Sequence, residues 1–281
     1  MILPIEDLPA SEAGFTALVL LAVLQGLAEF LPISSSGHLV VARLMLEVRD
    51  AGLALDVALH VGTLAAVTYA YRRDVRALFS DLFAGRPRMI LWLIIATVPV
   101  AVVGLTAKNW MEEVFHNQQA VAGALLTTAV ILLIGERARR KNQASFGEES
   151  VLGDEVELQP RMSDAVFIGT AQILALIPGI SRSGTTISAG LSRGLSPAQA
   201  ARLSFLMSLP AVAGAAIVEI PSALTEGFGE YSGTAVAAGA AIAGLVGIVA
   251  LKTLLVVLRK GAFIWFALYC ALLAIGLLIF A

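Results

Sequence analysis

The stretch QGLAEFLPISSSGHL, residues 25–39, places a carboxylate, three serines and a histidine at the end of an apolar run. Pro32 interrupts a helix here, because proline lacks an amide N–H and disfavours helical geometry in the residue before it. The serines that follow are of the type preferred at helix N-caps. The stretch therefore predicts an apolar helix, a break, and a second helix that begins near the serines.

The same pattern occurs again 147 residues further along the chain. Residues 172–186 read QILALIPGISRSGTT, and seven of these fifteen positions are identical to residues 25–39 without a gap. Pro178 and Gly179 form the second break, and Arg182 stands at the position aligned with Ser35. Two polar breaks in one alignment indicate an internal repeat.

The rest of the chain is too apolar for a soluble protein. Hydrophobic residues make up 58% of the 281 residues, charged residues make up 14%, and the mean hydropathy is +0.86. A soluble domain has about 25% charged residues. Runs of about 20 apolar residues, the length that crosses a bilayer as a helix, recur along the sequence. The composition predicts an all-α polytopic membrane protein.

Several function classes are disfavoured. The net charge of −2 and the lack of a basic stripe predict no nucleic acid partner. The sequence contains no GxxxxGK[ST] motif for an ATP-driven machine, and no HExxH or CxxC motif for zinc. Cys270 is the single cysteine, so an intrachain disulfide is impossible.

Apolar runs and breakers divide the chain into two halves of similar layout. Each half starts with an interrupted pair of apolar segments, residues 15–48 and residues 165–194, and continues with three candidate spans. The six candidate spans are residues 53–71, 89–106, 119–135, 197–219, 234–258 and 263–281.

Positive charge orients these segments, because loops rich in Lys and Arg face the cytoplasm. Lys and Arg concentrate in residues 72–88, 136–164 and 259–260, whereas the N-terminal tail and residues 220–233 contain none and residues 107–118 contain only Lys108. With this orientation each interrupted pair must enter and leave on one side of the membrane. Both pairs are therefore predicted to be re-entrant helix hairpins.

The predicted architecture is an inverted-topology repeat, because the two copies start from opposite faces of the membrane. The first repeat covers residues 1–135, a cytoplasmic loop covers 136–164, and the second repeat covers 165–281. In such folds the broken helices meet near the bilayer midplane and form the site there. A run of small residues at 235–247 predicts close helix packing, either inside the fold or in a homodimer.

The two breaks suit an anion such as phosphate. Helix N-termini carry free N–H groups and a positive dipole end, so two opposed N-termini would enclose an anion. A charge at the bilayer centre costs roughly 2.5–3.5 kcal/mol even on a lenient scale, so Arg182 needs a partner. Its guanidinium group matches phosphate oxygens. The alternative is that Arg182 pairs with Glu29 and only joins the two hairpins.

The candidate catalytic residues are Glu29, Ser35, His38 and Arg182. Glu29 could act as a general base, orient a histidine, hold a divalent cation, or merely reach a wet vestibule. Ser35 is a candidate nucleophile, and His38 could shuttle a proton or attack phosphorus. The candidate substrate-binding residues are Gln25, Ser34, Ser36, Gly37, Gly179, Ser181, Ser183 and Thr186. Asp56 and Arg202 are interpreted first as interface markers, although Arg202 could also reach the site.

At these two motifs the sequence resembles the undecaprenyl-diphosphate phosphatase family, also called the bacitracin resistance protein family. The likeness covers essentially the whole chain. The first family signature is matched by Gln25, Glu29, Ser34, Ser35, Ser36, Gly37 and His38, and the second by Pro178, Gly179, Ser181, Arg182, Ser183 and Thr186.

The resemblance implies hydrolysis of undecaprenyl diphosphate to undecaprenyl phosphate and inorganic phosphate, which recycles the lipid carrier of cell-wall synthesis. It implies a multi-pass protein of the bacterial plasma membrane whose site opens to the periplasmic or outer side. It also implies dependence on a divalent cation, Mg or Ca. Gln25 stands where many relatives have Glu, which removes a charge from a metal site built on a carboxylate pair.

Two other functions are weighed against hydrolysis. A transporter or flippase of undecaprenyl phosphate or a related anionic lipid is one, because inverted repeats with broken helices are transporter architecture. Glu29 together with His38 favours the enzyme, since a pure carrier needs no acid–base pair. A non-catalytic scaffold is the other, and the internal repeat of polar breaks argues against it. The sequence leaves open whether Ser35, His38 or water attacks phosphorus.

Overall fold

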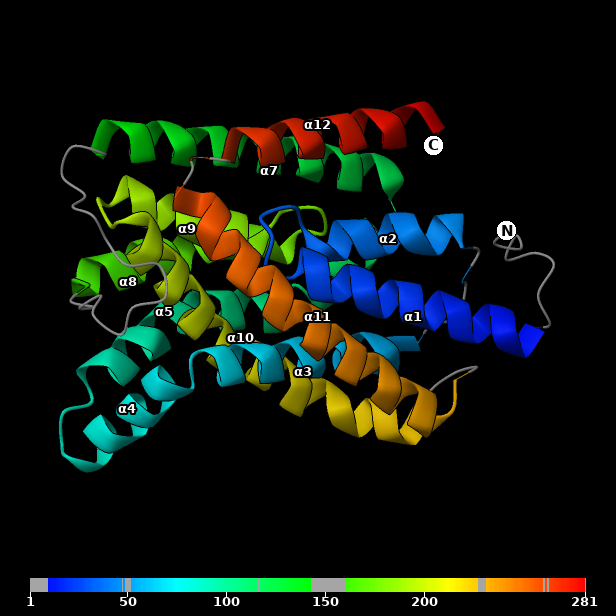
Figure 1. Cartoon of the computed structure of the whole chain (residues 1–281), viewed down its shortest axis with the longest axis horizontal. Helices are drawn as coiled ribbons and strands as arrows, with labels where there is room; N and C mark the ends of the chain where they lie inside the picture. Colours follow the sequence, from blue (N-terminus) through cyan, green and yellow to red (C-terminus); the bar gives the residue numbers. More distant parts are fainter. Residues whose placement is uncertain are drawn as a thin grey trace.

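The chain is all-helical where the structure describes it. The computed structural model describes residues 10–46, 48, 52–115, 117–142, 160–226, 231–259, 261 and 263–280. No strand occurs among these residues, which confirms the predicted all-α class. Most helices lie side by side along the longest axis of the molecule (Figure 1).

Six helices follow the predicted spans. They are α3 (Gly52–Ala70), α5 (Arg88–Thr106), α7 (Gln118–Asn142), α10 (Pro197–Glu226), α11 (Gly233–Arg259) and α12 (Phe263–Phe280). By length and composition α5, α7 and the greater parts of α10 and α11 can cross a membrane, whereas the described parts of α3 and α12 are shorter apolar helices. These helices indicate a multi-pass membrane protein.

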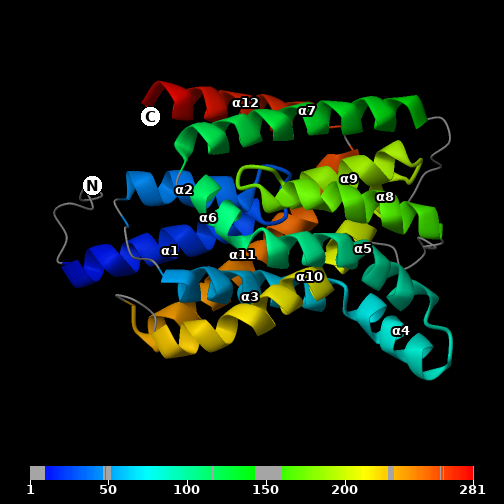
Figure 2. The ribbon, with the colours of Figure 1, turned by 180° about the vertical axis from the view of Figure 1, so that it is seen from behind.

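Both predicted breaks are present. α1 (Ala10–Ala28) ends in a run of turns before α2 (Ser35–Met45). α8 (Met162–Gln172) continues as the short 3-10 helix η3 (Ile173–Leu176) and a turn before α9 (Arg182–Ser192). The two breaks lie next to each other near the middle of the molecule (Figures 1 and 2). The re-entrant path of each hairpin and the inverted topology stay predictions.

The connections differ from the sequence prediction. α7 continues to Asn142 and α8 begins at Met162, so both ends of the expected loop 136–164 are helical, and residues 143–159 lie outside the described part. Glu136 extends α7, because its carboxylate accepts from Arg139 and Arg140 one turn later. Two further helices, α4 (Arg72–Phe83) and α6 (Lys108–Phe115), occupy segments expected to be loops. Both are too short and too charged to give an apolar run of spanning length.

Small residues set the closest helix contacts. A Cβ added to Gly62 of α3 would lie 2.0 Å from the carbonyl oxygen of Ala240, and one added to Gly26 of α1 would lie 2.6 Å from that of Ala243. Both carbonyls belong to the small-residue run 235–247 of α11. This run therefore packs inside the fold, as one of the two predicted uses requires, and the homodimer stays a prediction.

An aromatic contact anchors the first break to the core. Phe30 is fully buried, and its ring meets that of Phe205 of α10 edge-to-face, with the centroids 5.7 Å apart. Gly247 of α11 leaves room for this ring, since a Cβ there would lie 2.7 Å from it. Because Phe30 directly follows Glu29, its packing fixes the backbone that carries this carboxylate.

Replacing Gly62 by alanine is expected to lower the free energy of unfolding by about 1–3 kcal/mol, the usual cost of overpacking. The added methyl group would press on the backbone of Ala240, which cannot yield like a flexible side chain. Gly123 is the matched control, because a Cβ there meets nothing within 4 Å. Its change to alanine should be neutral or stabilising by up to about 1 kcal/mol. Unfolding in detergent, followed by circular dichroism, compares the two, and equal stabilities would contradict the close α3–α11 contact.

Candidate active site

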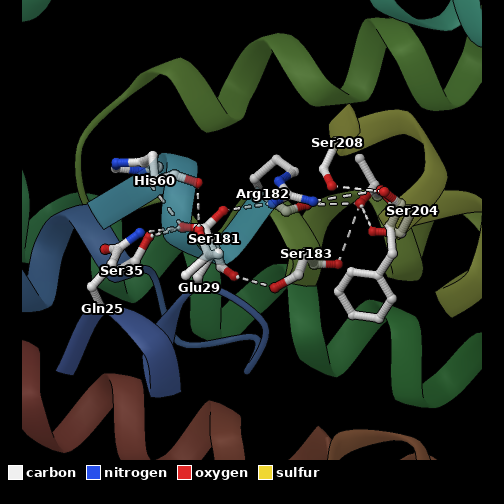
Figure 3. Close-up of polar contacts among 12 residues, drawn as sticks. Gln25, Glu29, Ser35, His60, Ser181, Arg182, Ser183, Ser204 and Ser208 are labelled. Carbon is white, nitrogen blue, oxygen red and sulfur yellow. Dashed lines mark hydrogen bonds and ion pairs between the residues drawn. The ribbon is translucent and has the colours of Figure 1, made fainter. Parts of the chain in front are cut away.

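Glu29 is the centre of a hydrogen-bonded cluster between the two breaks (Figure 3). Its side chain is nearly buried. Its Oε1 lies 2.6 Å from Nη2 of Arg182, and its Oε2 accepts from the Ser35 hydroxyl at 2.7 Å. Nε2 of Gln25, one helical turn earlier, donates to the same Oε2 at 3.1 Å. The cluster joins the two halves of the chain, because Glu29 and Arg182 are 153 residues apart.

The Glu29–Arg182 ion pair, which was considered above as the alternative to phosphate binding by Arg182, is thus present. This ion pair does not bury Arg182 completely, because the Arg182 side chain is still 18% exposed. Its Nη1 lies 3.5 Å from the carbonyl oxygen of Ser204 on α10. A contact that served only to join the hairpins would not need a serine hydroxyl on the same carboxylate, so the cluster also fits a chemical role.

Serines cap both helices that follow the breaks, as predicted. The hydroxyl of Ser34 accepts from the amide of Gly37 at 3.3 Å, and that of Ser181 accepts from the amide of Gly184 at 3.1 Å. The two pairs are related by the 147-residue offset of the sequence repeat. Both capping serines are buried. Their hydroxyls therefore satisfy helix N–H groups, and this accounts for two of the conspicuous serines without catalysis.

The two caps differ in backbone geometry. Ser34 has φ 72°, in the left-handed region that side-chain-bearing residues rarely adopt, whereas Ser181 has φ −72°. Backbone strain of this kind is concentrated at functional sites. Here it immediately precedes Ser35, whose hydroxyl is directed to Glu29, while the aligned position in the other copy carries Arg182.

The breaks contact each other directly. The amide of Gly179 donates to the hydroxyl of Ser36 at 3.4 Å, and the hydroxyl of Ser183 donates to the carbonyl of Leu31 at 3.2 Å. A Cβ on Gly37 would lie 3.1 Å from the Cα of Gly179, which itself has φ 102°. Gly37 therefore allows the two backbones to approach closely, and Gly179 allows the turn.

Thr128 of α7 forms hydrogen bonds with the backbone of the second break. Its hydroxyl donates to the carbonyl of Gly179 at 2.8 Å and accepts from the amide of Ser181 at 3.0 Å. Thr128 is fully buried. No sequence signal identifies this residue, because a single threonine in an apolar helix belongs to no motif. It holds the backbone from which Arg182 projects.

His38 points away from the cluster. Its Nδ1 lies 2.7 Å from the carbonyl of Ser34, and its Nε2 lies 2.7 Å from the hydroxyl of Tyr269 on α12. The carbonyl can only accept, so Nδ1 carries the proton, and in the neutral ring Nε2 accepts from Tyr269. Among the described residues, no hydrogen bond joins His38 to Glu29 or Ser35. Its catalytic role stays a prediction.

Thr186 and Arg202 face other helices. The hydroxyl of Thr186 lies 2.6 Å from that of Ser204 and 2.8 Å from the carbonyl of Arg182, so it ties α9 to α10. Arg202 pairs with Asp74 of α4. Asp56 pairs likewise with Arg43 of α2. The interpretation of both charges as interface markers stays a prediction. Contact of Thr186 with substrate stays a prediction.

His60 of α3 also belongs to this cluster, although it was not among the candidate residues predicted from the sequence. Its Nε2 lies 3.6 Å from Oε2 of Glu29, and its side chain is 35% exposed. Its Nδ1 lies 2.8 Å from the carbonyl of Asp56 and must donate to it, so Nε2 is the nitrogen that faces Glu29. No motif joins residue 60 to the breaks, and only the packing of α3 beside them reveals the contact.

The residues present do not fit a protein-built divalent cation site. Mg and Ca take six or more oxygen ligands. Glu29 already receives donors at both oxygens, and Gln25 adds one neutral oxygen, Oε1, which is buried without a hydrogen-bond partner. The described ranges contain no group of three or more His, Cys, Asp or Glu residues that could hold a metal. Dependence on Mg or Ca, with Glu29 as a ligand, stays a prediction.

Replacing Thr128 by valine is expected to lower the free energy of unfolding by about 1–3 kcal/mol, because it leaves a buried carbonyl and a buried amide unsatisfied. Thr127→Val is the matched control. Thr127 is exposed on the same helix and donates to the carbonyl of Gly123 one turn earlier. Its change should stay within about 0.5 kcal/mol. Unfolding of both variants in detergent tests this, and a Thr128→Val protein as stable as the control would contradict the role of Thr128.

Comparison with known proteins agrees with this geometry. The family model described as "Bacitracin resistance protein BacA" matches residues 18–276. Relatives named "Undecaprenyl-diphosphatase" include one from Syntrophotalea carbinolica, which is 42% identical over 92% of this chain and 96% of the relative. Others are from Corynebacterium efficiens, 36% identical over 94% and 90%, and Halothermothrix orenii, 36% identical over 94% and 96%. The chain belongs to the bacitracin resistance protein BacA family.

Proposed function

We propose that this chain hydrolyses undecaprenyl diphosphate to undecaprenyl phosphate and inorganic phosphate. The observation that carries the proposal is the meeting of Ser35, Glu29 and Arg182 between the two breaks. The relatives that bear the name of this activity align with the chain over nearly their whole length. No contact among the described residues favours the transporter alternative.

The site suits a reaction dominated by charge. Transfer of a phosphoryl group depends on positioning and electrostatic stabilisation more than on covalent help from the protein. α2 and α9 run away from the breaks in opposite directions (Figures 1 and 2), so their N-termini face each other. Their dipoles and the guanidinium group of Arg182 place positive charge where a diphosphate would lie.

Ser35 is the proposed nucleophile. Its hydroxyl donates to Glu29 at 2.7 Å, which is the arrangement of a nucleophile beside its base. Its Oγ attacks the terminal phosphorus, its proton passes to Oε2 of Glu29, and the anhydride bond breaks as undecaprenyl phosphate leaves. Water then hydrolyses the phosphoserine and releases inorganic phosphate. Direct attack by a water held at Glu29 gives the same products, and Ser35→Ala separates the two routes.

Arg182 changes partner in this scheme. In the structure its Nη2 is held by Oε1 of Glu29. A bound diphosphate would compete for the guanidinium group, which matches two phosphate oxygens at once. Arg182 then stabilises the charge that develops on phosphorus, while Oε1 is released and Glu29 can accept the proton from Ser35.

The proposed location is the bacterial plasma membrane, with the site open to the periplasmic or outer side. The arginine-rich helix α4, the arginine-rich C-terminal end of α7, and the C-terminal end of α11, which carries Arg259, lie toward one end of the molecule (Figure 1). This end would face the cytoplasm. The breaks would lie near the midplane, as in other inverted repeats, and each would be re-entrant from its own side.

The central test is phosphate release from undecaprenyl diphosphate by purified protein in detergent. Glu29→Gln is expected to lower release on the order of 100-fold or more, because it removes the base. Arg182→Ala should lower it by a similar order, since it removes the transition-state cation. Arg193→Lys is the control, because Arg193 pairs with Asp164 at the far end of α9 and should leave release unchanged.

If the native protein releases phosphate and Glu29→Gln releases it at a similar rate, Glu29 is not the base. If the well-folded native protein releases no phosphate, the proposed function is wrong. Ser35→Ala decides the nucleophile. A loss of about 100-fold would support attack by serine, whereas a loss of only a few-fold would support attack by water.

His60→Leu is expected to lower kcat about 10-fold or more with little change in KM, because the imidazole borders the oxygen that receives the serine proton. His60→Gln should restore most of the rate, since an amide can still contact Glu29. Thr68→Val is the control. Thr68 is exposed on the same helix and donates to the carbonyl of Leu64. Steady-state kinetics separates kcat from KM, and a native kcat in His60→Leu would exclude a role for His60 in the chemical step.

A further inference from the structure

The helix α4 lies at the edge of the core, where Leu78 packs against it. None of its 12 residues is buried. At 1.5 Å per residue it is about 18 Å long, too short to cross roughly 30 Å of hydrocarbon. It projects at one end of the molecule (Figures 1 and 2) and joins α3 to α5 through Tyr71 on one side and residues 84–87 on the other.

One face of α4 exposes large apolar side chains. The exposed fractions are 58% for Phe79, 44% for Leu82 and 87% for Phe83. Val75, four residues before Phe79, is half-buried and lies on the same face. Leu78 is also half-buried, but it packs against the core and marks the border of this face toward the bundle. A contiguous exposed apolar face of this kind marks a site of contact with a membrane or another molecule.

Arginines adjoin this apolar face. Residues 72–88 contain five arginines, two aspartates and no lysine, which gives this segment a net charge of +3. Arg72 and Arg76 are exposed and precede Phe79 and Phe83 in one series of three- and four-residue steps. Residues at this spacing share one side of a helix, so guanidinium groups and aromatic rings occupy adjoining parts of one surface.

An ion pair fixes the rotation of α4 about its axis. Asp74 pairs with Arg202 of α10, so the side of α4 that carries Asp74 faces the bundle. Phe83 follows nine residues later, which places it on the opposite side of the helix. The apolar face is thereby directed away from the rest of the protein, in agreement with the exposure of Phe83.

We propose that α4 lies in the headgroup region of the adjoining leaflet and binds anionic phospholipids. The apolar face would enter the boundary with the acyl chains, and the arginines would contact lipid phosphates. The membrane is the favoured occupant, because α5 is a spanning helix and α3 an apolar one, and both leave the hydrocarbon beside α4. A helix tied this closely at both ends cannot lie far from the membrane surface.

Site-directed spin labelling tests the proposal on the full chain in nanodiscs loaded with one copy each. Cys270→Ala removes the single native cysteine. Nitroxide labels are then placed singly at Phe79, at Phe83 and at Ala77, which is exposed on another side of α4. A label at Val102, exposed on α5, is the hydrocarbon reference. Each label's collision rate is measured with oxygen, which enters the acyl region, and with a water-soluble nickel chelate.

The proposal predicts an oxygen-to-nickel collision ratio at Phe79 and Phe83 that is severalfold higher than at Ala77 and approaches that at Val102. In nanodiscs with phosphatidylglycerol the ratio at Phe83 should exceed that in pure phosphatidylcholine. The double variant Arg72→Gln/Arg76→Gln should abolish this difference. Arg72→Lys/Arg76→Lys keeps the charge and should retain it.

Nickel accessibility at Phe83 equal to that at Ala77 in both lipids would overturn the proposal, because α4 would then stand in water. Protection of Phe83 that appears only when two copies share a disc would assign the surface to a second copy of the chain and overturn it as well. A ratio that is high in both lipids and insensitive to the arginine changes would overturn the anionic-lipid part. The readout does not depend on hydrolysis, so its outcome is separate from that of the proposed function.

Discussion

The ion pair between Glu29 and Arg182 is the interaction on which the centre of this structure depends. Its 2.6 Å contact joins the first break to the second and is largely shielded from solvent. Removing one partner of such a pair leaves an unpaired buried charge, which is far more costly than the pair itself is stabilising. The surrounding structure serves to keep the two charges in place. Phe30 packs on Phe205 beside Glu29, and Thr128 holds the backbone just before Arg182.

The second constraint is that irregular backbone buried inside the protein must have its polar groups satisfied there. Ser34 and Ser181 do so at the helix starts, and side chains of each break bond to the backbone of the other. Most of the serines that make the motifs conspicuous are thus occupied with structure. Ser35 is different, because its hydroxyl donates to the carboxylate of Glu29. The distinction between a structural and a chemical serine therefore lies in the partner, which a motif alone cannot reveal.

Local features were predictable from the sequence and long-range ones were not. Proline, glycine and serine at the breaks indicate helix ends and caps. Both breaks and both capping serines were therefore predicted at the residues where the structure has them. The spans followed from the length of apolar runs. Thr128, His60 and the direction of His38 depend instead on which helices pack against the breaks, and single residues in apolar helices carry no local signal of that. α4 was missed for another reason, since charged and polar residues interrupt its apolar residues, which never form a run of spanning length.

Glu29 is hydrogen-bonded to both Ser35 and Arg182, and this has a consequence for the proposed reaction. A ligand can bind Nη2 of Arg182 only by displacing the carboxylate of Glu29, so weakly charged phosphates compete poorly for it. A diphosphate carries more negative charge than either product and can present oxygens from two phosphoryl groups, so it competes best. After hydrolysis each product competes less well, and the Glu29–Arg182 pair can form again. The Glu29–Arg182 ion pair would in this way favour entry of the substrate and release of the products.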